Sequence, residues 1–343
     1  MRAPHTPHLL EAFPIYSSAF LSEHELILGG GGGATRSGIK NKLRLYNVKD
    51  DRSIELLHEH ELEKGEDAPM SMAAFAGDNT VVCGINSVEE LLKKGENQNC
   101  RVFSVNDKKL SLLGTHGTLP PGESDDFQKV TVISQDGQLV AVAGAHDLAI
   151  LSYPSLAPVA QQVHTEKEIY DVVFTASTIV VVTTSSLLIY SLPSIVESSS
   201  QVSSKGKGKR KEITNLTELE LLKSVDVPSV GGFQSGSTFR AARYHPQKTN
   251  VIYTVINTNP PRTSKKASRQ GYVCRWNTES WTVEKSRKVS DRGLTCFDIS
   301  ADGKLLAFGS SDLNIGLLDS TTLAVSLIVF WPTSTCSPQI SLL

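Results

Sequence analysis

Two stretches, VISQDGQLVAVAGAHDLAILSY (residues 132–153) and DISADGKLLAFGSSDLNIGLLDS (residues 298–320), share one arrangement. In each, a short apolar run ends at an Asp-Gly pair, and a second apolar run follows and ends in small residues. A third apolar run begins a few residues later. Asp-Gly accepts the positive φ angles of a tight hairpin. Each stretch therefore predicts three successive β-strands joined by short turns.

The third strand of this unit recurs six times along the chain. Each copy alternates or runs apolar, with β-branched or aromatic residues, and then reaches a small or polar turn. The copies are LRLYNV (43–48), CRVFSV (100–105), LAILSY (148–153), LLIYSL (187–192), VCRWNT (273–278) and IGLLDS (315–320). Looser copies of the preceding strand pair are SAFLSEHELILGG, MAAFAGDNTVVCG, DVVFTASTIVVVT and ARYHPQKTNVIYTV.

A unit of three or four strands, repeated every 40 to 70 residues or so, is typical of the blades of a β-propeller. The fold class is therefore all-β, and we expect six recognisable blades. A sandwich pair or another all-β domain is the alternative. The one helix-like piece is short and covers residues 87–94.

Composition narrows the function classes. The chain has 343 residues, 34 of them basic and 36 acidic, and this balance gives no general attraction to nucleic acid or an anionic membrane. Its five cysteines are scattered without a C-x-x-C pair, as expected for reduced thiols in the cytosol and not for a disulfide framework or a zinc site. No apolar run approaches the roughly 20 residues of a membrane-spanning helix.

Two polar segments interrupt the repeat. ESSSQVSSKGKGKRKEIT (197–214) lacks the apolar residues needed to offset the entropy of ordering, so we expect a disordered loop. Its KGKGKRK run is typical of a solvated surface insertion. A nuclear localisation signal, or a patch that binds acidic groups, is the alternative. NTNPPRTSKKASRQG (257–271) is expected to be a long loop within the fifth blade.

Five consecutive glycines, residues 29–33, lie between two predicted strands of the first blade. Residues 33–38 have the glycine spacing of a phosphate-binding loop, but Ile39 stands where that motif needs Lys, and a strand follows instead of a helix. Nucleotide binding is therefore not expected. The rest of the chain shows no nucleophile elbow, so we expect no covalent catalysis. His58 and His60 have no third metal ligand nearby in sequence, and Asp125 with Asp126 is expected to be a solvated pair.

Successive glycines can turn several carbonyl oxygens toward one point. Such a cluster is stable only around a donor or a cation, and a monovalent cation suits neutral oxygens, to which the Asn41 side chain could add one. The alternative is a flexible crossover between the second and third strands of blade one.

The same loop resembles the signature loop of the Sec12 family, also called prolactin regulatory element-binding protein in animals. FPIYSSAFLSEHELIL, just before it, also resembles that family's first blade, whereas the blades to about Ser326 match only as generic propeller units. The residues that carry the resemblance are Gly29–Gly33, Gly38, Ile39, Asn41, Lys42 and Leu43.

The resemblance implies a seven-bladed WD40-like propeller on the cytosolic face of the endoplasmic reticulum. Such a protein is a guanine nucleotide exchange factor for the small GTPase Sar1 and initiates COPII coat assembly. It implies a potassium ion in the loop, held by Asn41 and by backbone carbonyls around Gly31, Gly33 and Gly38. Asn41 and Ile39 would be the important residues for exchange. The loop residues in contact with the GTPase would be Thr35, Gly38, Ile39, Lys40 and Asn41. A non-catalytic propeller scaffold for protein–protein interaction is the alternative function.

The chain departs from the family pattern at its C-terminus. The family's transmembrane helix is absent, and after LAVSL no further strand–turn–strand unit follows. We therefore expect a propeller over residues 1–331 and an irregular tail over 332–343. The seventh blade should be incomplete, with a gap or a partial blade built from residues 323–330 and the N-terminal HLLEAFPIY. Its exposed apolar surface should make the chain marginally stable.

Overall fold

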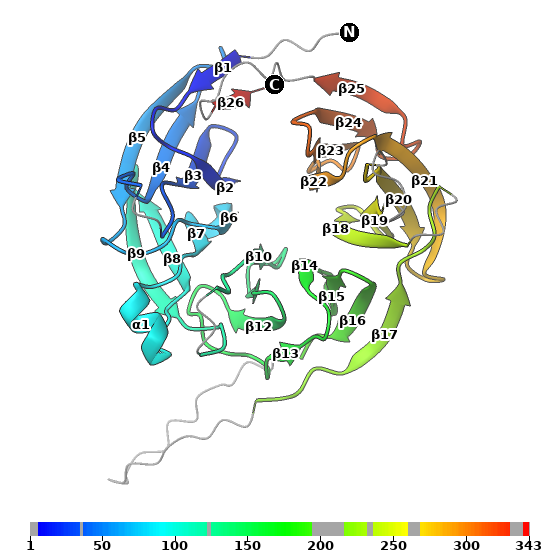
Figure 1. The fold of residues 1–343 in the computed structure, drawn as a ribbon, viewed down its shortest axis with the longest axis horizontal. Coiled ribbons are helices and arrows are strands. Elements are labelled where there is room, and N and C mark those ends of the chain that lie inside the picture. Colours follow the sequence, from blue (N-terminus) through cyan, green and yellow to red (C-terminus); the bar gives the residue numbers. More distant parts are fainter. Residues whose placement is uncertain are drawn as a thin grey trace.

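The structure is a computed structural model that describes residues 6–34, 37–121, 125–193, 216–231, 236–259, 268–329 and 339–342. Six four-stranded antiparallel sheets are arranged in a ring, each with its first strand innermost (Figure 1). The sheets are blade 1, β2 (Ile15–Phe20), β3 (Glu25–Gly30), β4 (Lys42–Val48) and β5 (Ile54–Glu61); blade 2, β6 (Ser71–Phe75), β7 (Thr80–Gly84), β8 (Cys100–Asn106) and β9 (Lys109–His116); blade 3, β10 (Val130–Ile133), β11 (Leu139–Ala143), β12 (Asp147–Ser152) and β13 (Val163–His164); blade 4, β14 (Ile169–Phe174), β15 (Thr178–Thr183), β16 (Ser186–Ser191) and β17 (Leu221–Asp226); blade 5, β18 (Ser237–His245), β19 (Lys248–Thr258), β20 (Gly271–Asn277) and β21 (Thr282–Ser290); and blade 6, β22 (Leu294–Ile299), β23 (Leu305–Ser310), β24 (Ile315–Asp319) and β25 (Val325–Val329).

The repeat read from the sequence is confirmed. All six copies of the recurring unit fall on the third strands β4, β8, β12, β16, β20 and β24. Gly137 and Gly303 have φ values of 67° and 72° in the two Asp-Gly hairpins. The helix-like piece forms helix α1 (Glu89–Lys94), and a single 3₁₀ turn covers Ala76–Asp78.

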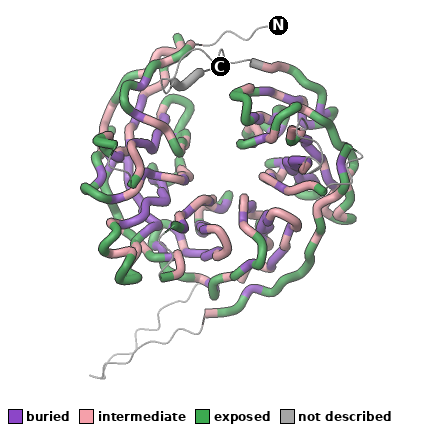
Figure 2. The backbone as a smooth tube through the Cα atoms, viewed as in Figure 1, coloured by how far each residue is buried: buried purple, intermediate pink, exposed green. Residues whose placement is uncertain are grey.

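The core is divided among the blade interfaces. One buried apolar cluster joins blades 1 and 2 and includes Ile27, Leu43 and Phe103, and four others join each following pair of blades. Buried residues accordingly lie along the middle of each blade, whereas the outer strands are mostly exposed (Figure 2). Since each sheet buries its faces on its neighbours, no blade can be stable alone.

The chain ends pair with each other. β1 (Thr6–Leu9) and β26 (Gln339–Leu342) form a two-stranded antiparallel sheet in the arc between blades 1 and 6 (Figure 1). The expectation of an irregular tail is therefore wrong for residues 339–342. The expected seventh-blade strand at 323–330 is wrong too, because Val325–Val329 is the outer strand of blade 6. The basic insert 197–214 lies wholly outside the described residues.

Antiparallel strand order places two sets of connections on one face of the ring. These are the links from second to third strands and the links from one blade to the next. We call this side the loop face. It carries the glycine segment between β3 and β4, and the segment between β7 and β8 that contains α1.

Candidate functional site

The glycine segment connects β3 to β4, as the sequence predicts. It begins where the Gly31 amide donates to the Pro14 carbonyl at 2.9 Å. Gly31 has φ +139° and Gly33 has φ +69°, and both values favour glycine. A Cβ atom at Gly31 would lie 2.3 Å from Asn41 Oδ1, so glycine is also required there to let the two ends of the segment approach.

Asn41 closes the segment. Its side chain is 9% exposed and makes three hydrogen bonds at the base of the loop. The Gly33 amide donates to Asn41 Oδ1 at 2.9 Å, and Asn41 Nδ2 donates to the Gly33 carbonyl at 2.9 Å and to the Glu66 carbonyl at 2.7 Å. The Asn41 carbonyl also accepts from the Leu62 amide at 2.9 Å. The loop is thus tied to its own first half and to the connection between blades 1 and 2.

Glu66 extends this tie into blade 2. Its carboxylate forms an ion pair of 2.6 Å with Arg101 on β8, and both side chains are less than one tenth exposed. The second carboxylate oxygen accepts from the Glu63 amide at 2.9 Å, and Arg101 Nε donates to the Gln98 carbonyl at 3.1 Å. We call Gly33, Asn41, Glu66 and Arg101 the loop clamp.

The clamp leaves the tip of the loop open to solvent. Ala34, Ser37, Gly38 and Lys40 are exposed, and Ile39 is half-buried. Ser37 Oγ accepts from the Ile39 amide at 3.3 Å, and Lys40 pairs with Glu61 at 2.5 Å with both side chains exposed. Thr35 lies outside the described residues. Of the predicted site residues, the structure therefore brings Gly31, Gly33 and Asn41 together at the base and leaves Gly38 and Lys40 at the tip.

The base of the loop gathers three oxygens, each of which accepts a hydrogen bond from Gly33 or Asn41. The oxygens gathered there are neutral, namely the Asn41 amide oxygen and the carbonyls of Gly33 and Glu66. Within the described ranges no group of three His, Cys, Asp or Glu side chains could hold a metal ion. The hydrogen bonds of Asn41 already order the base of the loop, so an ion would add to this clamp.

Sequence reasoning missed the rest of the loop clamp, because Glu66 is 25 residues from Asn41 and its ion-pair partner Arg101 is in the next blade. A comparison of blades offers the missing signal. Asn99 precedes β8 as Asn41 precedes β4, and its buried amide likewise bonds to the link to the following blade, at Thr118 and Gln128. An asparagine before the third strand is therefore a structural device of blades 1 and 2, and the exposed glycine tip distinguishes blade 1.

The other polar residues singled out in the sequence, His58, His60 and Asp126, make structural contacts. His58 Nδ1 accepts from the Leu110 amide at 3.2 Å, and the His60 ring meets the Phe103 ring edge-on at 5.3 Å. Burial lowers the pKa of His60, and the neighbouring His58 lowers it further. Asp126 was expected to be solvated but is buried, and its carboxylate accepts from the Ala145 amide.

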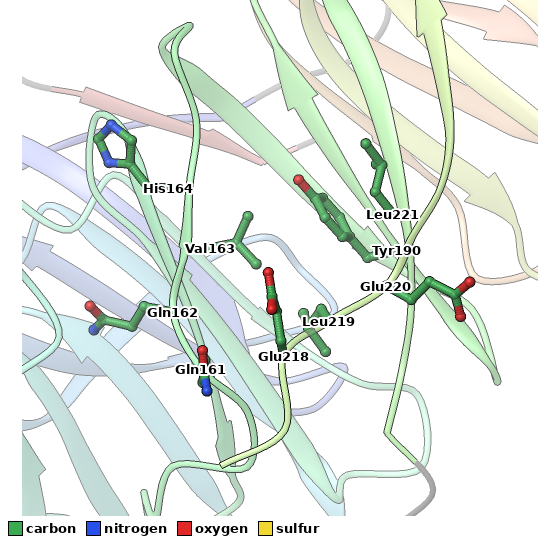
Figure 3. A pocket seen from close by; sticks show the side chains of 9 residues that line it. All are labelled: Gln161, Gln162, Val163, His164, Tyr190, Glu218, Leu219, Glu220 and Leu221. Carbon is green, nitrogen blue, oxygen red and sulfur yellow. The ribbon is translucent and has the colours of Figure 1, made fainter. Parts of the chain in front are cut away.

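A hollow lies between the outer strands of blades 3 and 4 (Figure 3). His164, Tyr190 and Glu218 face it, together with two glutamines, but neither Ser nor Cys lines it. His164 Nδ1 lies 3.0 Å from Asp147 Oδ1. The described lining therefore holds no Ser–His–Asp or Cys–His arrangement.

Comparison with known proteins first defines the class. The structure aligns with the C-terminal WD40 domain of Sif2, with a TM-score of 0.56 and 11% identity, over 95% of this chain and 89% of that one. The fold is therefore a WD40 propeller. No family model matches the sequence.

The sequence comparison is more specific. The chain is 22% identical over 331 residues to the guanine nucleotide-exchange factor SEC12 of Candida glabrata, covering 94% of this chain and 64% of SEC12. It is 22% identical over 321 residues to the SED4 protein of the same yeast, covering 91% of this chain and 28% of SED4. The chain is thus a distant relative of SEC12 and SED4 over most of its length, and it spans under two thirds of theirs. In the part of the chain that the structure describes, no helix has the length and apolar content to cross a bilayer.

Proposed function

We propose that this propeller is a guanine nucleotide exchange factor for a small GTPase of the Sar1 type. The observation that carries the proposal is the clamped glycine loop, in a chain distantly similar along most of its length to SEC12. By the same reasoning, its place of action is the cytosolic face of the endoplasmic reticulum, at the start of COPII coat assembly.

Exchange requires no covalent chemistry from the propeller. The factor must bind the nucleotide-free GTPase more tightly than the nucleotide-bound form, and by linkage the nucleotide and the factor then weaken each other's binding equally. A loop pressed against the nucleotide site achieves this by steric and polar competition. Its ordering must precede binding, because otherwise the binding energy is lost to entropy.

The clamp provides such ordering. Asn41 fixes Gly33 and holds the loop to the blade 1–2 connection, so that residues 37–40 leave the loop face from a rigid base. We assign contact with the GTPase to Thr35, Gly38, Ile39, Lys40 and Asn41. A potassium ion is a further part of the proposal. Asn41 and the carbonyls of Gly31 and Gly33 at the base would hold it, and Gly38 would join them only if the tip folded back toward the base; when bound, the ion would supply electrostatic stabilisation of the loop.

The test is release of a fluorescent GDP analogue from purified Sar1 in the presence of this chain. The wild-type chain should accelerate release, and Ile39→Ala should remove most of the acceleration without lowering the unfolding midpoint. Leu113→Ala is the matched control, since Leu113 is a 58% exposed aliphatic side chain on the outer strand β9. Equal activity of the two variants, or no acceleration by wild type, would overturn the exchange proposal and favour a non-catalytic scaffold.

A further inference from the structure

Three arginines meet in a pocket on the loop face at the junction of blades 4, 5 and 6. Arg240, Arg269 and Arg292 line a cavity of about 560 Å³ together with Tyr170 and Ser311. Arg240 is half-buried on the innermost strand β18, whereas Arg269 and Arg292 are exposed on connections that precede β20 and β22. None of the described residues that line the pocket is acidic.

Local hydrogen bonds build this pocket. Asn257 is 5% exposed and holds Leu294 through two bonds, with Nδ2 donating to the Leu294 carbonyl at 2.9 Å and Oδ1 accepting from its amide at 2.8 Å. Ser268 Oγ donates to the Asp291 carbonyl at 2.7 Å and so ties the segment that carries Arg269 to the one that carries Arg292. The Arg240 guanidinium lies over the Tyr170 ring, 5.1 Å from its centre.

The positive charge of the pocket is only partly offset, because the Asp291 carboxylate also interacts electrostatically with Arg292. Asp291 pairs with Lys288 at 2.6 Å, and Asp171 pairs with Arg243 at 2.5 Å. Among the ion pairs of the described residues, none involves the three pocket arginines. Like charges held close together are unfavourable, so a site of this kind gains when an anion enters it.

The number and type of these groups indicate the ligand. Guanidinium groups present planar pairs of N–H donors that match phosphate oxygens, and three of them favour a doubly charged anion over a single carboxylate. The Ser311 hydroxyl adds a donor at the rim. We propose that this pocket binds a phosphate monoester dianion carried on the side chain of a phosphorylated peptide.

The position of the pocket favours a peptide over a bilayer. Tyr170 and Arg240 lie on β14 and β18, the innermost strands of blades 4 and 5 (Figure 1). A flexible chain can place a phosphorylated side chain there, whereas a flat membrane surface meets the outer parts of the loop face first. The site is independent of the glycine loop in blade 1 and goes beyond the exchange activity proposed above.

The experiment is calorimetric titration of the full chain with O-phospho-L-serine, followed by competition with inorganic phosphate. We expect saturable binding that weakens with ionic strength. Loss of one charge-assisted contact corresponds to roughly tenfold in affinity, so Arg240→Gln combined with Arg292→Gln should weaken binding at least tenfold. Arg287→Gln is the matched control, because Arg287 is exposed on the outer strand β21.

Thermal unfolding of each variant checks that the fold is retained. Equal binding by the double variant and by Arg287→Gln would overturn the assignment, as would equal affinity for L-aspartate and O-phospho-L-serine. Sedimentation with phosphatidylcholine vesicles that contain phosphatidylinositol 4-phosphate tests the other source of this chemistry. Vesicle binding that requires Arg240 and Arg292, without binding of O-phospho-L-serine, would refute the peptide and point to a lipid headgroup.

Discussion

Asn41→Ala is the sharpest test of how the loop is ordered. The substitution removes three hydrogen bonds, two to Gly33 and one to the Glu66 carbonyl. A hydrogen bond contributes about 1 kcal/mol net. Gly33 is partly exposed, so water replaces some of its bonding, whereas the bond to Glu66 is buried. We therefore expect the free energy of unfolding to fall by about 2–3 kcal/mol.

Two measurements separate loop disorder from general loss of stability. Hydrogen exchange of the Gly33 amide reports the loop directly, because that amide donates to Asn41 Oδ1. Urea unfolding reports the whole chain. Asn99→Ala is the matched control, since Asn99 is fully buried and bonds to Thr118 and Gln128 in blade 2.

The two variants should differ in a defined way. Asn99→Ala should destabilise the chain at least as much as Asn41→Ala, yet leave exchange of the Gly33 amide and release of GDP from Sar1 unchanged. Asn41→Ala should instead speed up hydrogen exchange of the Gly33 amide and abolish the acceleration of GDP release. If the Gly33 amide stays protected in Asn41→Ala, or if both variants lose the same activity, the clamp does not order the loop and the reasoning fails.

Three further predictions concern other parts of the molecule. Replacing potassium by tetramethylammonium should increase amide exchange in the glycine loop and slow GDP release; identical values in both salts would argue against the ion. Removing one partner of a buried ion pair costs roughly 3–5 kcal/mol, so Arg101→Met should strongly lower the free energy of unfolding in urea. Adding Glu66→Leu should recover part of that loss, because no unpaired charge then remains buried. A further fall in stability in the double variant would contradict this. Burial, and then the charge of His58, lowers the pKa of His60 below its usual 6.5 in the folded chain. As the pH falls through 6.5, His60 is therefore protonated in the unfolded chain before it is protonated in the folded one, and this lowers the stability of the fold. His60→Phe should therefore show a smaller stability difference between pH 7.5 and 5.5 in urea, and an unchanged difference would exclude this histidine.

The local parts of the fold were readable from the sequence because they depend on local rules. Alternation and Asp-Gly pairs determine strands and hairpins within some twenty residues, and β12 and β24 lie where those rules place them. The glycine segment was placed between two strands for the same reason. Its chemistry was only partly readable, because the role of Asn41 depends on Glu66, which reaches it only after blades 1 and 2 stack.

Long-range pairing explains the remaining differences. Pairing of β1 with β26 joins residues more than three hundred positions apart, and no local pattern marks it. Asp126 appeared to be a solvated charge in a Pro/Gly loop, yet the link between β11 and β12 covers it and donates to it. The arginine pocket likewise gathers residues from three blades whose sequences show nothing unusual.

The loop clamp also has a mechanical consequence. A loop held only by its own strands is a hinge, and a load on its tip bends it. Here the base has two supports, one at Pro14 in blade 1 and one that passes through Glu66 to Arg101 in blade 2. The base of the loop is therefore fixed to blades 1 and 2, and a force that a bound partner exerts on the tip is transmitted to both sheets.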